Sequence, residues 1–134
     1  MLNRKEVHNS ETLNIQIDCH AQKSYLIELS KDCTKFDLNV ECLENSFSKF
    51  FILNHAESAC ELNINMVLKQ DANCQMGVLD LEKSPLKWNH YVDLKEQGAE
   101  YEILSGQLCQ EHIEKVCDME VRHNAPHTNG QMKN

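Results

Sequence analysis

The sequence contains little of what a membrane span or a nucleic-acid binder requires. Its 134 residues include only four glycines and two prolines, and no apolar run is longer than Phe50–Leu53. A bilayer-spanning helix needs about 20 apolar residues, so we expect none here. Acidic residues outnumber basic ones by 21 to 13, for a net charge of −8. That balance argues against a general binder of nucleic acid or anionic membranes, because both attract basic surfaces.

The sequence also lacks the signs of a secreted, disulfide-bonded domain. Met1–Glu6 carries charges with no apolar stretch behind them, so we expect no secretory signal. There are seven cysteines, and none stands in a C-x-x-C pair, whereas a secreted disulfide framework favours an even number. We therefore predict a cytoplasmic protein with reduced thiols, most of them small buried apolar residues. We also expect no two of them to approach disulfide distance with the proper geometry. The cysteines are Cys19, Cys33, Cys42, Cys60, Cys74, Cys109 and Cys117.

Apolar and polar residues alternate along most of the chain, which is the pattern of half-buried β-strands. The longest alternating run extends from Cys60 to Leu68. The runs begin at steps of 11 to 14 residues, a regularity typical of a stacked array. Their first residues are Leu13, Tyr25, Phe36, Phe50, Leu62, Cys74, Trp88, Tyr101 and Ile113.

The breaks between the runs favour a solenoid over a meander. Asn-Gly, the strongest two-residue hairpin signal, occurs only at Asn129-Gly130. Small residues recur just before the strands, as tight solenoid corners require, at Cys33, Ala59, Ala72 and Ala99. We predict an all-β parallel β-helix with two strands per coil of about 25 residues, and an antiparallel sandwich is the alternative. The predicted inward residues are Leu38, Leu62, Ile64, Met76, Val92 and Ile103.

The segment from Cys109 to Cys117 is ambiguous. Its apolar residues also include Ile113 and Val116, spaced as on one face of a helix. The segment is short for an independent helix. A strand is our preferred interpretation because of the resemblance described next.

The end of the sequence carries a recognisable pattern. Residues 121–133 read VRHNAPHTNGQMK, which resembles the segment v-x-H-x-a-p-x-T-x-[SG]-x-x-x-[KR] in the core of the SufB/SufD family of iron–sulfur cluster assembly proteins. The small corner Gln97–Glu100 between two strands also resembles that family. The matching tail positions are Val121, His123, Ala125, Pro126, Thr128, Gly130 and, with one residue of slack, Lys133.

The resemblance implies a fold and a function. It implies a right-handed parallel β-helix, with residues 1–10 as a lead-in and residues 11–134 as a partial, truncated core domain. It further implies a SufD-like scaffold subunit that is not itself an enzyme. Such a subunit acts with a SufB-like subunit and a SufC-like ABC ATPase. It handles the iron–sulfur cluster only within the complex and binds no stable cofactor of its own.

The densest set of potential metal ligands lies near the same end: Cys109, His112, Cys117, His123 and His127. Iron and zinc accept both thiolate and imidazole, but the spacing fits no closed structural site. The alternative is two buried cysteines with solvent-facing histidines, and a structural role for His123 at a corner. No Ser/His/Asp set and no glycine-rich phosphate loop can be read.

Two other functions remain open from the sequence. One is a thiol- and histidine-based metal-binding or redox-sensing solenoid module, suggested by the seven cysteines. The other is a carbohydrate-active solenoid enzyme, which the aromatic content of 6% and the single Trp do not favour. We also expect the last coil, with Met119 and Val121, to be exposed at its C-terminal face and to promote self-association.

Overall fold

The computed structural model describes residues 2–80, 84–107, 115–125 and 127–133. These residues form β-strands joined by short corners, and no helix long and apolar enough to cross a membrane is found among them. The strands are β1 (Leu2–Val7), β2 (Ser10–Ile17), β3 (Gln22–Leu29), β4 (Lys35–Cys42), β5 (Phe47–Asn54), β6 (Cys60–Leu68), β7 (Asn73–Asp80), β8 (Leu86–Leu94), β9 (Glu100–Gln107), β10 (Lys115–His123) and β11 (Asn129–Lys133).

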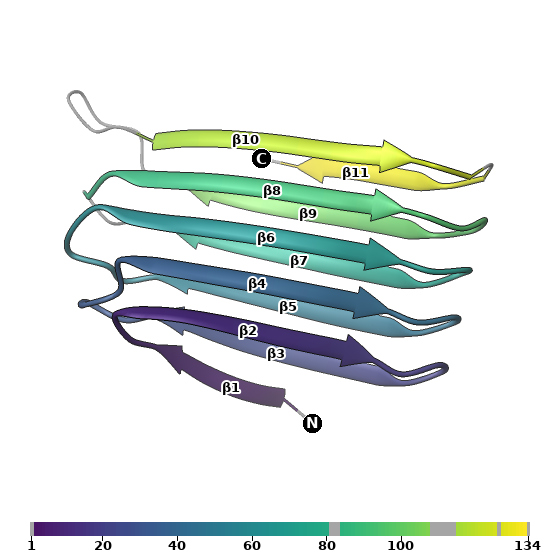
Figure 1. Ribbon diagram of the computed structural model, residues 1–134, viewed down its shortest axis with the longest axis horizontal. Coiled ribbons are helices and arrows are strands. Elements are labelled where there is room, and N and C mark those ends of the chain that lie inside the picture. The colour runs from purple at the N-terminus through teal and green to yellow at the C-terminus, as the bar shows by residue number, and fades with distance from the viewer. Residues whose placement is uncertain (1, 81–83, 108–114, 126, 134) are drawn as a thin grey trace.

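The strands alternate between two parallel sheets. The odd-numbered strands form a six-stranded sheet in the order β1-β3-β5-β7-β9-β11, and the even-numbered strands form a five-stranded sheet in the order β10-β8-β6-β4-β2. Figure 1 shows the even-numbered strands in front of the odd-numbered ones, with the chain winding as a right-handed coil. The prediction of a parallel β-helix with two strands per coil is confirmed, and the antiparallel sandwich is wrong because every neighbouring pair of strands is parallel.

The core lies between the two sheets and consists of side chains stacked in register from coil to coil. Leu38 of β4 pairs with Ile64 of β6, for example, and both are buried. Because side chains alternate across a strand, a register without slippage keeps each inward column continuous along the solenoid. All six side chains predicted to point inward are buried: Leu38, Leu62, Ile64, Met76, Val92 and Ile103.

The first strand lies where the sequence suggested only a lead-in. Leu2–Val7 has no clear apolar alternation, yet it forms β1 by pairing in parallel with β3. In this first coil an ion pair of 2.9 Å between Lys5 Nζ and Glu11 Oε2 takes the place that apolar pairs have in later coils. A polar inward pair suits an end coil, because charged groups there keep contact with water.

The ambiguous segment is a strand as far as it is described. Lys115–His123 forms β10 in register with β8, while Cys109 and Ile113 lie outside the described residues. Met119 and Val121 are only partly buried against the core, and Cys117 is exposed. Self-association through this coil stays a prediction.

The cysteines divide into buried and exposed groups. Cys33, Cys42, Cys60 and Cys74 are buried, as expected for small apolar residues. Cys19 and Cys117 are exposed, and Cys109 lies outside the described residues. Small corner residues are buried at Cys33, Ala72 and Ala99, but Ala59 is exposed.

Candidate functional site

The corner between each even-numbered strand and the next odd-numbered strand repeats one backbone conformation. In the corner before β7, for example, Ala72 N donates to Lys69 O at 3.1 Å. The third residue of each of these turns has a positive φ, and a small residue follows it. The positive-φ residues are His20, Asn45, Asp71, Gly98 and His127. The motif of the tail therefore lies in the last member of a repeated series of corners.

Two motif residues are hydrogen-bonded to each other in that last corner. His123 Nδ1 lies 2.6 Å from Thr128 Oγ1, and Thr128 Oγ1 donates to Ala125 O at 3.3 Å. The hydroxyl has a single hydrogen, so this arrangement makes the His123 imidazole the donor to Thr128. The pair ties the end of β10 to the start of β11, which agrees with the structural role considered for His123.

Gly130, another motif residue, lies where a side chain would fit only tightly. A Cβ atom built there would lie 3.1 Å from Val121 Cγ1 and 3.7 Å from His123 Cε1. Glycine thus lets β11 approach β10 closely. Lys133 pairs through its backbone with Leu104, and Pro126 lies outside the described residues.

The candidate metal ligands are not brought together where they can be located. Cys109 and His112 lie outside the described residues. Cys117 is near the start of β10 and His123 at its end, a separation of about 20 Å at the usual rise per residue. His127 is exposed in the corner beyond. The described part of the chain contains no group of three or more His, Cys, Asp or Glu residues placed to hold a metal ion.

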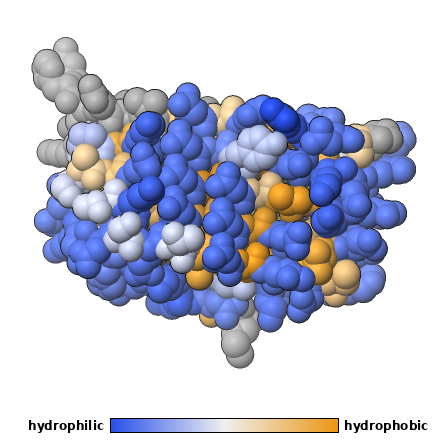
Figure 2. Space-filling view, in the orientation of Figure 1, coloured by the Kyte–Doolittle hydropathy of each residue, from blue (hydrophilic) through white to orange (hydrophobic). Residues whose placement is uncertain are grey.

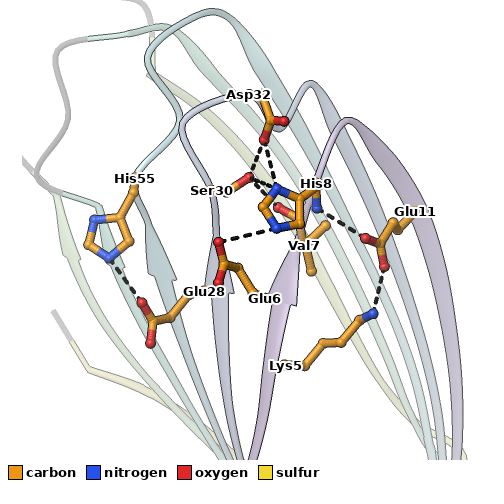
Figure 3. A network of polar contacts seen from close by, with 9 residues as sticks. All are labelled: Lys5, Glu6, Val7, His8, Glu11, Glu28, Ser30, Asp32 and His55. Carbon is orange, nitrogen blue, oxygen red and sulfur yellow. Dashed lines mark hydrogen bonds and ion pairs between the residues drawn. The ribbon is translucent and has the colours of Figure 1, made fainter.

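The fold assembles a Ser, a His and an Asp that sequence reasoning missed (Figure 3). Ser30 Oγ lies 3.1 Å from His8 Nδ1, and Asp32 Oδ1 lies 3.2 Å from the same nitrogen. Glu6 Oε1 is 3.2 Å from His8 Nε2. Ser30 and Asp32 are two residues apart in one corner, about one coil after His8, and that spacing was the only signal available in the sequence.

These contacts form a polar network and not a nucleophile with its base. The Ser30 hydroxyl has two acceptors within reach, Val7 O at 2.7 Å and Asp32 Oδ1, and its hydrogen bond to Asp32 holds the pKa of that carboxyl below its usual range. The hydroxyl proton is therefore not available to His8, whose two ring nitrogens both face carboxylates. The negative charge of Asp32 would also oppose the charge that develops on an attacking oxygen.

A second polar group is buried inside the solenoid. Trp88 Nε1 donates to His90 Nδ1 at 3.1 Å, so His90 Nε2 carries the hydrogen and donates to Tyr101 Oη at 2.6 Å. Burial lowers the pKa of His90 to about 3 and raises that of Tyr101 well above its ordinary value. Neutral His90 satisfies two neighbouring polar groups and is only 2% exposed.

The outer face of the even-numbered sheet carries ladders of amide side chains. Asn39 Nδ2 donates to Asn14 Oδ1 at 2.9 Å, and Asn65 Nδ2 donates to Asn39 Oδ1 at 3.2 Å. A second ladder joins Asp37, Asn63 and Asn89. Figure 2 shows this face as largely hydrophilic with smaller hydrophobic areas. The ladders link successive coils, as cross-strand pairs do in other sheets.

The outer face of the odd-numbered sheet contains an apolar groove. Leu2, Phe51 and Leu104, with exposed fractions of 50%, 42% and 54%, all line this hollow of about 380 Å³. The ring of Phe51 lies over Gly77, where a Cβ atom would come within 2.6 Å of it. Exposed apolar patches of this kind are common at contact surfaces.

The fold defines the chain as a parallel β-solenoid. Comparison with known protein families, with curated proteins and with solved structures finds no match.

Proposed function

We propose that this chain is a SufD-like scaffold subunit of iron–sulfur cluster assembly. In this proposal it acts in the cytoplasm with a SufB-like subunit and a SufC-like ABC ATPase. It catalyses no reaction of its own, and the cluster is held only transiently by the full complex.

The observation that carries the proposal is the arrangement of the tail motif. The His123–Thr128 hydrogen bond and the tightly packed Gly130 occupy one corner of the solenoid. Positions that match the SufB/SufD pattern thus lie in contact, as expected if the pattern encodes a corner of a shared β-helix. The solenoid itself agrees with the fold of that family.

Scaffolding is favoured over catalysis by the polar groups already described. Carboxylates contact both ring nitrogens of His8, and His90 is buried within the core. Both use their hydrogen bonds for structure. The outer faces, by contrast, carry side-chain ladders and an apolar groove, features suited to protein contacts.

Co-expression tests the proposal directly. The chain, tagged at its N-terminus, is produced with a SufB-like and a SufC-like protein, purified without oxygen, and analysed by size-exclusion chromatography with light scattering. We expect a stable complex that contains all three chains and takes up iron and sulfide. Recovery of the tagged chain alone, at equal expression of the partners, would contradict the proposal.

Two control measurements separate the proposal from its alternatives. Anaerobic iron titration of the isolated chain should show no stoichiometric thiolate-to-iron absorption, whereas a metal-binding module would show it. Thr128→Val should lower recovery of the SufB-like subunit, because it removes the hydroxyl that orders the motif corner. His127→Asn is the matched control, since asparagine tolerates the positive φ of that residue.

A further inference from the structure

Two of the buried cysteines contact each other across successive coils. The Sγ atoms of Cys33, just before β4, and Cys60, the first residue of β6, lie 3.8 Å apart. A hydrogen bond of 3.0 Å from Glu61 N to Thr34 O holds the two segments side by side. Because Lys35 pairs with Glu61, the two cysteines are offset from each other by one residue along the strands. Strand spacing and rise then give a Cα–Cα separation of about 6 Å, within the range that a disulfide spans. This proximity is contrary to the expectation from the sequence that no two cysteines would lie so close.

A small molecule can reach this pair from one side. Cys60 is 4% exposed and lines a corner hollow of about 330 Å³, together with Ala59 and Pro85. Cys33 lies behind it with no exposed surface. The hollow is large enough for a molecule the size of hydrogen peroxide, so peroxide can approach Cys60, whose Sγ lies 3.8 Å from that of Cys33.

We propose that Cys33 and Cys60 form an oxidative modification site at which a peroxide produces a disulfide between successive coils. The Cys60 thiol reacts with the peroxide to give a sulfenic acid and water. The Cys33 sulfur then attacks the Cys60 sulfur, a second water leaves, and the S–S bond forms. Two thiols are oxidised and one hydrogen peroxide is reduced to two waters. The site is independent of the proposed function.

The burial of the two thiols determines how fast they are oxidised. Burial raises the pKa of Cys60 to about 12 and also raises the pKa of Cys33, so both thiols are protonated at neutral pH. Because the thiolate is the reactive form and both thiols are buried, oxidation at this pair is slow. Once formed, the link constrains the unfolded chain and stabilises the solenoid.

Peptide mapping of the oxidised protein tests the site. Exposed thiols of the folded chain are first blocked with iodoacetamide, the protein is incubated with hydrogen peroxide, and the remaining thiols are alkylated after unfolding. Trypsin can cut after Lys35 and Lys49, so the two cysteines fall in separate peptides. We expect one cross-linked peptide pair joining Cys33 to Cys60, cleaved by dithiothreitol, and a higher midpoint of thermal unfolding in the oxidised protein.

The control variant is Cys33→Ala, which keeps a small apolar side chain at the corner. Peroxide should then give no cross-link at Cys60 and no rise in the unfolding midpoint. The proposal is overturned if both thiols stay reduced in the wild-type chain, if Cys60 becomes sulfinic acid while Cys33 remains free, or if other cysteines form the link. Oxidation of the urea-unfolded chain verifies that cross-linked peptides are detected.

Discussion

Acid should destabilise the solenoid through His90. The imidazole is neutral in the folded chain because it is buried between Trp88 and Tyr101, with a pKa of about 3 against an ordinary value of 6.5. In the unfolded chain the same imidazole takes up a proton below about pH 6.5. The unfolded state therefore binds more protons between these two pH values, and stability is lost as the pH falls through that window.

The magnitude follows from the two pKa values. Within the window, the free energy of unfolding falls by about 1.4 kcal/mol for each pH unit. Between pH 7.5 and pH 5 the loss amounts to about 2 kcal/mol, because protonation of the unfolded chain begins only near pH 6.5. Above pH 5 most carboxylates of ordinary pKa remain ionised, so this range isolates histidine.

Urea unfolding, followed by the fluorescence of the single Trp, measures this loss at a series of pH values. His90→Gln is the matched variant, because its amide can accept from Trp88 and donate to Tyr101 without titrating. Its stability should be lower at pH 7.5 but nearly constant down to pH 5. If the variant and the wild-type chain lose stability in parallel over this range, the reasoning about His90 is refuted.

Two further predictions concern the corners. Gly98→Ala should lower the free energy of unfolding by about 1 to 3 kcal/mol, because Gly98 has a φ of 80° and a Cβ atom would overlap Asp71 Oδ1. In urea unfolding, the double variant with Asp71→Gly should recover part of this loss. An unchanged unfolding midpoint for Gly98→Ala would contradict this prediction. Thr128→Val should cost about 1 kcal/mol through loss of the hydrogen bond to His123, whereas His127→Asn should be close to neutral by the same measurement.

The architecture was predictable because it depends on local periodicity. Alternation fixes which side chains can share a face, and steps of nearly constant length place successive strands over one another. Leu38 and Ile64, for instance, were assigned to the core from spacing alone, and they lie in register. The first strand was not predicted because apolar and polar residues alternate too weakly in Leu2–Val7. It forms a strand through its backbone pairing with β3, which its own sequence does not indicate.

The polar contacts were decided only by the tertiary structure. The sequence by itself determined the period, the apolar columns and the small corner residues, since each depends on neighbours along the chain. It could not show that His8 meets Ser30, that Cys33 meets Cys60, or that Cys117 and His123 lie at opposite ends of one strand. Coils of unequal length set which residues of successive turns come into contact, and a shift of one residue changes every such pair.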